Sequence, residues 1–596
     1  MNTVNLKTDR YHRPFMADPL VSVARLLAPA FAQVAGVASD AVAIDPVVRP
    51  SEHAHAQVNG ALQLAKQLGR SPREVAADII AVANLGHVAT LDVAGPGFIN
   101  VTFGDGFLNE QIAVVAADPR LGVQAPELVE TVVIDYSAPN VAKEMHVGHL
   151  RTTVIGDALV RMYAFQGHRV IRENHIGDWG TPFGMLIEHM VDVAGTENVD
   201  RLELGDLDAF YKQARVKFDE SDEFKERARE RVVKLQSRDH LETTRLWQAL
   251  VIESTRHFNE LYGKLGILLT DHDLAGESFY QPFMPEVLQR LADVGLLEES
   301  DGAQVVWVPG YTNREGAPLP LIVQARTGGF NYATSDLACV IDRVERLQAT
   351  LLLYVVGTPQ SQHLAMVWKV AQMAGWLVPP ARAVHVNFGN VLGTDRKMMK
   401  SRSGDPMRFI DLVDEAVDRG RAGVAEHSPD LASHEQAELG RIIGIGALKY
   451  AELSVDRIKD YVFDWDRMLA FEGNTAPYLQ YAHARIRSIF RRADIASSDV
   501  RDVAPIIGQP QERQLAIRLL GYDGALRETI ERCAPHRLCT YLFDLAQDFT
   551  GFYEACPVLK AETDELRLSR LALADLTARV LAHGLSMLGI EAPEQM

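Results

Sequence analysis

The stretch TVVIDYSAPNVAKEMHVGHLR, residues 131–151, joins an apolar run to a segment of helical periodicity. Its first part, TVVIDYS (131–137), has the continuous apolar character of a buried strand. A second β-like run, RVIREN, follows at 169–174. This order predicts a βαβ unit, with residues 137–148 at the point where the first strand hands over to the helix N-terminus. The helix is predicted from apolar residues at helical spacing, namely Val147, Leu150, Val154, Ala158 and Met162.

The same pattern recurs later in the chain. LLLYVVG occupies residues 351–357, a helical segment covers about 361–376, and AVHVNFGNVLG occupies 383–393. Because crossover connections make successive strands parallel, the two patterns predict the two halves of one Rossmann-like parallel sheet. Ligands bind such sheets at the carboxyl ends of the strands, where the two halves meet.

The flanking segments predict further domains around this α/β sheet. A helical run from Asp18 to Gly36 and an alternating stretch from His87 to Phe103 indicate a small α+β domain. Beyond Asp411, amphipathic helices with few Pro or Gly breaks indicate a helical bundle. We therefore expect an N-terminal α+β domain at 1–125, a Rossmann-like parallel-sheet domain at 126–415 with an inserted subdomain at about 191–310, and a C-terminal all-α helical bundle at 416–596.

Composition excludes several classes of protein. The 60 Lys and Arg against 79 Asp and Glu give a net charge of -19, so any contact with nucleic acid must be local. The four cysteines form no C-x-x-C pair, which predicts neither a zinc knuckle nor a disulfide framework and fits a reducing cytoplasm. No stretch of ~18 uninterrupted apolar residues is found, so we expect a cytoplasmic protein that neither crosses a membrane nor is exported.

The chemistry-bearing residues begin at the predicted helix N-terminus. Such an end offers unpaired N–H groups and a positive dipole, so His146 and His149 beside it are candidates to stabilise charge growing on ATP phosphates. Gly148 lacks a side chain and leaves room for an adenine ring. From spacing alone, two alternatives stay open: a surface feature, or a metal site formed together with Glu144.

A lysine-rich loop, KMMKSRSG, follows the last strand of the second half at residues 397–404. Lys397, Lys400 and the Ser401 hydroxyl are suited to neutralise the oxygens of a triphosphate as pyrophosphate leaves. Such a loop, taken alone, is more often a solvated surface segment. Its position after the second half of the sheet favours the phosphate-binding interpretation.

The chain resembles the class I aminoacyl-tRNA synthetases. His-x-Gly-His at residues 146–149 resembles their HIGH motif, and PNVAKEMHVGHLRTTVIGDALVR (139–161) is closely similar to the arginyl members. KMMKSRSG resembles the KMSKS loop, with Met399 where that motif has its first Ser. The resemblance implies ATP-dependent activation of L-arginine and transfer to the 3′-terminal adenosine of tRNA(Arg). It also implies Mg²⁺ carried with ATP, no protein-bound zinc, and a monomer.

Selection of arginine requires acidic side chains, because a guanidinium is a planar fork of donors. Glu277, Tyr332 and Asp336 resemble the guanidinium-binding residues of the family, and the last two lie four residues apart on one helical face. On sequence alone, a Tyr or Asp at a strand end is more often a cap or a core hydrogen-bond partner than a substrate ligand. The resemblance further implies that Asp135, Asn140 and Gln360 hold the substrate's amino and carboxylate groups, and that Lys143 reaches the phosphates.

The C-terminal helices contain a candidate tRNA-binding stripe. His483, Arg487 and Arg491 recur at i, i+4 and i+8, with Tyr478 and Tyr481 nearby. Arginine against phosphate and aromatic rings against bases is typical of contacts with single-stranded loops, whereas a solvated bundle face is the alternative. The resemblance favours anticodon recognition by this domain. It implies contact of residues 1–125 with the tRNA elbow, and activation of arginine that depends on bound tRNA.

Two rivals are weighed against this interpretation. Another HIGH-type nucleotidyltransferase, or a synthetase for a different amino acid, is disfavoured by the long helical C-terminus and by the Glu277, Tyr332 and Asp336 set. A catalytically silent tRNA-binding paralogue is disfavoured because both motif histidines and both loop lysines are present. GDWG, residues 177–180, also matches the family, without a chemical role that the residues themselves indicate.

Overall fold

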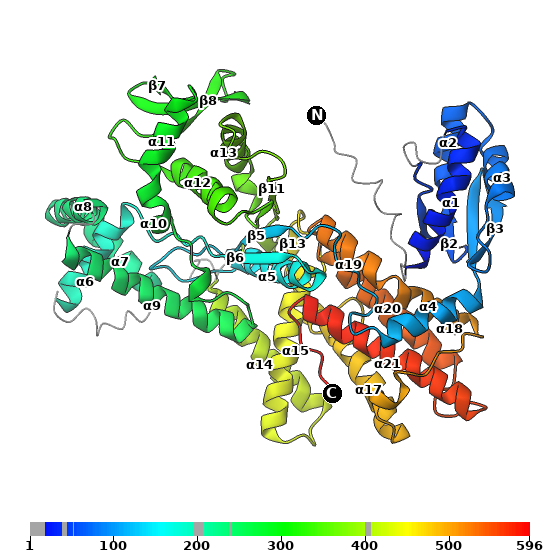
Figure 1. Cartoon of the computed structure of the whole chain (residues 1–596). Helices are drawn as coiled ribbons and strands as arrows, with labels where there is room; N and C mark the ends of the chain where they lie inside the picture. Colours follow the sequence, from blue (N-terminus) through cyan, green and yellow to red (C-terminus); the bar gives the residue numbers. More distant parts are fainter. Residues whose placement is uncertain (1–17, 38–43, 52, 196–206, 238–239, 400–406) are drawn as a thin grey trace. The chain divides into compact units, whose positions relative to one another are not determined.

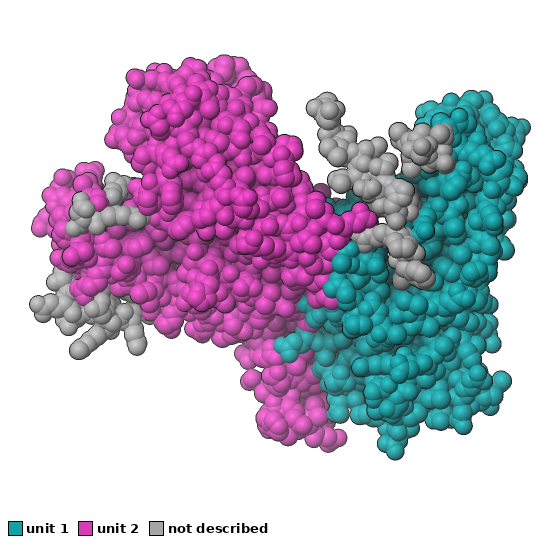
Figure 2. Space-filling model, in the orientation of Figure 1, with its two compact units in different colours: residues 1–125, 471–586, 591–596 teal, residues 126–470, 587–590 magenta. Residues whose placement is uncertain are grey.

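The computed structural model describes residues 18–37, 44–51, 53–195, 207–237, 240–399 and 407–596. The chain divides into two compact units, coloured separately in Figure 2. Unit 1 combines residues 1–125 with 471–586 and 591–596, and unit 2 contains residues 126–470 and 587–590. The N-terminal and C-terminal segments of the chain thus share one unit, while the predicted parallel sheet lies in the other.

Unit 2 is built on a parallel sheet of strand order β11-β10-β5-β6, as the two βαβ patterns predict. The central strand β5 (Thr131–Asp135) is buried from its second residue onward, which explains its continuous apolar run. Its carboxyl end, Asp135, pairs in register with Glu173 on one side and Tyr354 on the other. The other strands are β6 (Arg169–Glu173), β10 (Leu351–Tyr354) and β11 (Arg382–His385).

Helices α5 (Gly148–Gln166) and α13 (Ser361–Met373) follow the two central strands. Helix α5 is buried along most of its length. It is capped by Gly167, whose φ of 114° is sterically accessible because glycine has no Cβ. Helix α13 begins after the short turn η6 (Thr358–Gln360), and the apolar face that includes Leu364, Val367 and Val370 packs into the core of the second half. Residues 136–147 connect β5 to the N-terminus of α5, and residues 355–360 connect β10 to the N-terminus of α13.

The inserted segment has a helical part and a β part, in the predicted order (Figure 1). The charged region becomes helices that contact one another and α6, while a three-stranded antiparallel sheet of order β7-β8-β9 forms the β part. After the β part, α12 carries residues 332–341 and continues into the π-helical turn η5. The elements are α6 (Pro182–Ala194), α7 (Leu207–Glu220), α8 (Asp222–Ser237), α9 (Leu241–Leu265), η3 (Asp271–Asp273), α10 (Glu277–Tyr280), η4 (Gln281–Phe283), α11 (Met284–Asp293), β7 (Glu298–Ser300), β8 (Ala303–Thr312), β9 (Pro318–Gln324), α12 (Tyr332–Ile341) and η5 (Asp342–Arg346).

Unit 2 continues to Ala470, beyond residue 415 where the sequence places the domain boundary. Helix α15 (Ser433–Leu453) contacts α5, and its buried Glu452 pairs with the buried Arg151 of α5. Strand β13 (Tyr461–Val462) pairs with β12 (Val391–Leu392). Amphipathic periodicity predicts these helices but does not reveal which neighbour their apolar face meets. The remaining helices of this segment are α14 (Phe409–His427) and α16 (Trp465–Met468).

The N-terminal part of unit 1 is the predicted α+β domain. Helix α1 is capped by Asp18, whose carboxylate accepts from the Leu20 amide at 2.8 Å, and it ends at Gly36 in the left-handed conformation. A four-stranded antiparallel sheet has the order β1-β2-β4-β3. The elements are α1 (Pro19–Ala35), β1 (Val48–Pro50), β2 (Ala56–Val58), α2 (Gly60–Leu68), α3 (Pro72–Val82), β3 (Ala89–Ala94), β4 (Phe98–Phe103) and α4 (Asp105–Ala117).

The C-terminal part of unit 1 is helical, as predicted, and it packs on the N-terminal part. Arg513 makes two hydrogen bonds to Asp105 at 2.6 and 2.8 Å, and Asp523 accepts from the Gln124 amide at 3.0 Å. The sequence did not predict this association, because the partners are about four hundred positions apart. The helices are α17 (Ala476–Ala493), η7 (Ser497–Val500), α18 (Pro510–Leu520), α19 (Tyr522–Glu531), α20 (His536–Ala555) and α21 (Asp564–Met587).

Two sequence predictions about the whole chain can be compared with these units. All four cysteines, for which the sequence predicts no disulfide framework, are free and buried in the structure. Among the described residues, no helix combines the length and apolar character that a membrane crossing requires.

Candidate active site

The loop that joins β5 to α5 holds a strained backbone. Ser137, Ala138 and Ala142 have φ of 73°, 47° and 59°, a region that costs non-glycine residues roughly 1 kcal/mol or more each. Hydrogen bonds from surrounding elements hold this conformation. Ser137 Oγ lies 2.7 Å from the Tyr262 hydroxyl, and the Ala142 amide donates to Ser254 Oγ at 2.9 Å. Helix α9 of the insertion therefore helps to shape the loop that presents the predicted residues.

His146 and His149 lie together at the N-terminus of α5, as predicted. Their ring centroids are 4.2 Å apart. The Gly148 amide donates to His146 Nδ1 at 3.0 Å, and the His146 amide donates to His149 Nδ1 at 3.2 Å. A neutral imidazole that accepts through Nδ1 carries its proton on Nε2. His146 is thereby set as an Nε2 donor toward a ligand, whereas His149 Nδ1 also lies 3.3 Å from the His146 carbonyl, to which the other tautomer donates.

The charge state of His149 follows from its surroundings. Burial, and then the neighbouring His146, lower the pKa of His149 to about 4. The ring is therefore neutral at physiological pH, and it stabilises an anion as a hydrogen-bond donor rather than as a cation. Gly148 is needed for a reason that the sequence did not give: a Cβ there would lie 2.7 Å from Cε1 of His146. The approach of an adenine ring to Gly148 stays a prediction.

The lysine loop begins and ends beside fixed structure. At its start, the Gly393 amide donates to the carbonyl of Lys397 at 2.8 Å, and the Lys397 side chain is exposed. Lys400 and Ser401 lie outside the described residues. Just after the loop, the Val147 amide donates to the Met407 carbonyl at 2.9 Å. Met407, which follows the loop in sequence, is thus paired with the backbone of the two-histidine turn, which agrees with a shared role at one ligand.

Three predicted polar residues lie exposed near these elements. The Lys143 ammonium lies 4.6 Å from the centre of the Tyr211 ring on α7, so it points toward the insertion. Asn140 forms an isolated bridge with Gly177 of the GDWG string, which ties this string to the loop. Gln360 lies in the turn η6, directly before α13. Their contacts with a substrate stay predictions.

Asp135 is engaged inside the protein. Its Oδ2 accepts from the buried Arg343 of η5 at 2.7 Å, and Arg343 Nε also donates to Glu173 at 2.6 Å. The guanidinium lies 4.7 Å from the centre of the Tyr354 ring. The sequence assigned Asp135 to the substrate without this partner, because Arg343 is distant along the chain. A substrate contact by Asp135 stays a prediction, and it would share this carboxylate with Arg343.

Glu277 begins the short helix α10 and is fixed by the GDWG string. Asp178 accepts from the Ser278 amide at 2.8 Å and from the Ser278 hydroxyl at 2.6 Å. Gly276 permits this approach, since a Cβ there would lie 2.6 Å from the Asp178 carboxyl group. No role for Asp178 could be predicted from the sequence, and in the structure it positions the segment carrying Glu277. Burial raises the pKa of Glu277 to about 7, with further contributions from Asp178 and Asp336.

Tyr332 and Asp336 lie one turn apart on α12 and share a partner from α13. His363 Nε2 donates to Asp336 Oδ2 at 2.5 Å, because a carboxylate can only accept. The His363 ring centroid also lies 4.6 Å from that of Tyr332. Asp336 influences the pKa of Glu277, so the two carboxylates act within one electrostatic environment, as the guanidinium prediction requires.

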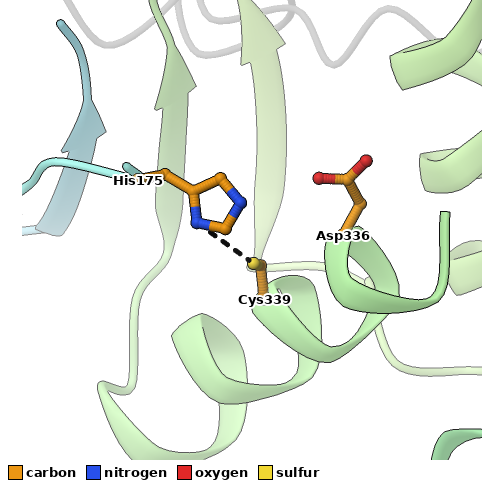
Figure 3. Close-up of side chains that lie close together, drawn as sticks. All are labelled: His175, Asp336 and Cys339. Atoms are coloured by element: carbon orange, nitrogen blue, oxygen red, sulfur yellow. Dashed lines mark hydrogen bonds between the residues drawn. The ribbon is translucent and has the colours of Figure 1, made fainter. Parts of the chain in front are cut away.

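His175 and Cys339 lie beside Asp336 (Figure 3). The potential ligand atoms of these three residues lie within 4.8 Å of one another. His175 Nδ1 is 2.7 Å from the Ala275 carbonyl, to which it donates, and 4.0 Å from Cys339 Sγ. Burial raises the pKa of the Cys339 thiol. The sequence analysis missed both residues. His175 has a weak signal in its place two residues before the GDWG string.

The acidic pocket, defined as Glu277, Asp178 and Asp336, has histidine neighbours: His363 is bonded to Asp336, and His175 lowers the pKa of Glu277 against the effect of burial. Among the described residues, no lysine or arginine forms an ion pair with any of the three carboxylates. Glu277 and Asp336, together with the exposed Tyr332 ring, thus offer acceptors and a π-face that no described lysine or arginine occupies. This arrangement can hold a ligand guanidinium.

The predicted tRNA-binding stripe lies on one face of α17, but part of that face is covered. His483 is 1% exposed and its Nδ1 lies 2.9 Å from the Pro593 carbonyl, to which it donates. Arg487 donates to Asp575 at 3.1 Å, and Arg491 donates to the Glu594 carbonyl at 3.0 Å. The expectation of a solvent-facing stripe is corrected: these side chains hold the C-terminal segment. Arg491 and Tyr481 remain exposed, and Tyr478 is partly buried beside Phe543.

Three segments of the chain match families of known function. Residues 111–465 match the family described as "tRNA synthetases class I (R), catalytic domain". Residues 22–103 match "Arginyl tRNA synthetase N terminal domain", and residues 479–596 match "DALR anticodon binding domain". The first match contains the two-histidine turn, the acidic pocket and the described ends of the lysine loop.

Relatives match over nearly the whole chain. Arginine–tRNA ligase of Thermobifida fusca is 52% identical over 584 residues, covering 98% of this chain and 100% of the relative. The enzyme of Escherichia coli O127:H6 is 46% identical, covering 93% and 96%. Arginyl-tRNA synthetase of Plasmodium falciparum superposes with a TM-score of 0.84 at 25% identity, covering 98% of this chain and 100% of the other. That of Thermus thermophilus gives 0.78 at 26% identity, covering 96% and 100%. The chain therefore belongs to the arginyl-tRNA synthetases, a family of class I aminoacyl-tRNA synthetases that use ATP.

Proposed function

We propose that this chain activates L-arginine with ATP and joins it to the 3′-terminal adenosine of tRNA(Arg), releasing AMP and pyrophosphate. One observation carries the proposal. An acidic pocket whose carboxylates pair with no described lysine or arginine lies in the same unit as a two-histidine turn at a helix N-terminus. The pocket suits a guanidinium, and the turn suits the phosphates of ATP.

In the first step, an oxygen of the arginine carboxylate attacks the α-phosphorus of ATP. The bond to the bridging oxygen breaks, and pyrophosphate leaves with the electron pair. His146 and His149 donate through Nε2 to phosphate oxygens. Lys397, Lys400, Ser401 and Lys143 supply positive charge and a hydroxyl, while Mg²⁺ arrives with ATP. Catalysis is positioning and charge stabilisation, so no covalent enzyme intermediate is needed.

In the second step, the 2′-hydroxyl of the terminal adenosine attacks the carbonyl carbon of arginyl-adenylate. The ester bond to the tRNA forms as the acyl–phosphate bond breaks. AMP leaves with the electron pair, and the hydroxyl proton passes to a phosphate oxygen or solvent. The protein's part is again to hold both groups in place.

Selection of arginine rests on the acidic pocket, with Glu277, Asp336 and Tyr332 around the guanidinium. Asn140, Gln360 and Asp135 hold the amino and carboxylate groups. A site with several acceptors aimed at five donors leaves them unpaired with other amino acids, which discriminates by ~10⁴ or more. We therefore propose that the enzyme needs no editing site.

We propose no protein-bound metal at the cluster of His175, Asp336 and Cys339. The Asp336 carboxylate is already bonded to His363, and His175 Nδ1 is bonded to the Ala275 carbonyl. His175 Nδ1 and Cys339 Sγ lie 4.0 Å apart, whereas two ligands of a tetrahedral zinc ion at ~2.0–2.3 Å are separated by roughly 3.3–3.8 Å. Because these atoms already have hydrogen-bond partners, the cluster suits a guanidinium better than a metal ion.

The tRNA contacts are proposed at the level of domains. The C-terminal helices recognise the anticodon region, with the exposed Tyr481 and Arg491 as candidates and Tyr478 beside them. His483 and Arg487 contribute by holding the C-terminal segment. Residues 1–125 contact the tRNA elbow. The enzyme is proposed to act in the cytoplasm as a monomer, with arginine activation dependent on bound tRNA.

The experiment is attachment of each of the twenty radiolabelled amino acids to total tRNA, beside ATP–pyrophosphate exchange with and without tRNA. Charging by arginine alone, with exchange only when tRNA is present, supports the function and the tRNA dependence together. Charging by another amino acid contradicts the pocket assignment. Binding of tRNA without charging favours a catalytically silent paralogue.

A further inference from the structure

His363 contacts two of the proposed guanidinium-binding side chains and has no role in the function proposed so far. It is the third residue of α13, three positions after Gln360. Its Nε2 donates to Asp336 Oδ2 at 2.5 Å, and its ring lies 4.6 Å from the Tyr332 ring with a 57° angle between the planes. One imidazole thus joins both α12 residues to the other half of the sheet.

Asp336 and Tyr332 need such a partner, because a side chain at the edge of a pocket can otherwise sample several rotamers. The hydrogen bond fixes one carboxylate oxygen of Asp336 and leaves the other available to a ligand. The ring contact restricts Tyr332, whose side chain is 65% exposed. Preorganised acceptors bind a planar donor fork more tightly than mobile ones.

The position of His363 does not itself depend on these contacts. Helix α13 is anchored by the buried Leu364, Val367 and Val370, and the last two lie four and seven residues after His363 on the same side of the helix. His363 is only partly buried, with 16% of its side chain exposed. Removing its imidazole therefore leaves the helix in place while releasing Asp336 and Tyr332.

We propose that His363 is a positioning residue that orients Asp336 and Tyr332 for the guanidinium of arginine. This proposal rests on the proposed function and extends it to a residue that does not itself contact the substrate. His363 sets the KM for arginine and the preference for arginine over lysine. It leaves ATP binding unaffected, since the two-histidine turn is held by other contacts.

Three variants separate the two contacts of His363. His363→Gln keeps an N–H donor of similar reach but loses the ring, His363→Phe keeps the ring but loses the donor, and His363→Ala loses both. Gln362→Ala, at the exposed neighbouring position, is the matched control. KM for arginine, KM for ATP and kcat are measured by ATP–pyrophosphate exchange with tRNA present, together with the melting temperature.

The expected result is a rise of about tenfold or more in the arginine KM for His363→Ala, with the ATP KM within about twofold of the parent. His363→Gln recovers most of the loss, and His363→Phe recovers less. Equal KM values in His363→Ala and Gln362→Ala overturn the proposal. It is also overturned if both KM values and the melting temperature change together. If the parent enzyme itself does not use arginine, the proposed function fails, and this inference fails with it.

Discussion

Two groups of carboxylates in unit 2 differ in whether an arginine of the protein pairs with them. In the internal group, Asp135 and Glu173 bind the buried guanidinium of Arg343, with the Tyr354 ring 4.7 Å from it. The protein thereby supplies its own cation. These contacts are two carboxylates and one aromatic face, which is a sufficient set to hold a guanidinium out of water.

The acidic pocket also combines two carboxylates with an aromatic ring, but no described lysine or arginine pairs with them. Glu277 and Asp336 are its carboxylates and Tyr332 is its aromatic ring, while the pKa of Glu277 is raised to about 7 by burial and by neighbouring carboxylates. Helix α12 and its continuation η5 carry Tyr332 and Asp336 at one end and Arg343 at the other. The acidic pocket lacks the arginine that the internal group contains, and we propose that the guanidinium of the substrate takes its place.

The largest expected effect follows from removing the pocket's charge. In Glu277→Gln combined with Asp336→Asn, the arginine kcat/KM should fall by about 10³-fold or more, because two charge-assisted contacts are lost. The measurement is ATP–pyrophosphate exchange with tRNA present. The control is Glu286→Gln on α11, whose carboxylate is 64% exposed. A double variant with parental arginine kinetics would show that the guanidinium binds elsewhere.

Removing the resident cation should damage stability. Arg343→Met leaves Asp135 and Glu173 buried without a counter-charge, and the free energy of unfolding should fall by roughly 3–5 kcal/mol. Urea unfolding measures this change, with Arg346→Met, on the exposed side of the same turn, as the control. A loss below about 1 kcal/mol in Arg343→Met would mean that the internal group is not the structural pair described here.

Arginine binding should depend on pH through the carboxyl group of Glu277. A bound cation favours the ionised form of Glu277, whose pKa is about 7 without ligand. Binding therefore releases a proton below that pH, and the arginine KM should rise by up to about tenfold per pH unit as pH falls below about 7. The Glu277→Gln variant should lose this component of the pH profile. An identical profile in both proteins would assign the titration to another group.

The raised pKa of Glu277 predicts the opposite pH trend for the stability of the unliganded fold. Its folded pKa is raised above the value of 4.5, so the unliganded fold is favoured at low pH and this stabilisation is lost as pH rises through about 7. Glu277→Gln should therefore raise the melting temperature more at about pH 8 than at about pH 5. Differential scanning calorimetry without arginine tests the sign.

The smallest effect concerns the aromatic face. Tyr332→Phe keeps the ring, so the arginine KM should change by less than about threefold, whereas Tyr332→Ala should raise it by about tenfold. The two values are compared in the same exchange assay. A large loss in Tyr332→Phe would show that the hydroxyl, rather than the ring, recognises arginine.

Local patterns in the sequence predicted much of the fold. The run 131–137 and the helical spacing after Val147 gave β5 and α5, and the later pattern gave β10, α13 and β11. The sequence could not show that α15 belongs with α5, or that the two ends of the chain share a unit. Those associations depend on which apolar faces meet, and periodicity does not contain that information.

The part of the candidate site that comes from one contiguous motif was predictable from the sequence. His146 and His149 are neighbours in sequence and in space. Glu277, Tyr332 and Asp336 were identified by resemblance, but their partners were not. The partners that were missed are Arg343, Asp178 and His363. Each lies far along the chain from the group that it contacts, and no local sequence pattern distinguishes it from other polar residues. Their roles arise only from tertiary contacts.

Aminoacylation of total tRNA with L-arginine and with L-citrulline tests the account most directly. Citrulline has nearly the same shape, but its neutral urea group replaces the guanidinium. The account predicts that kcat/KM for citrulline is at least ~10³-fold lower, because the acidic pocket is left without its cation. Comparable charging of tRNA with citrulline would contradict the claim that the unpaired carboxylates of the pocket select the substrate.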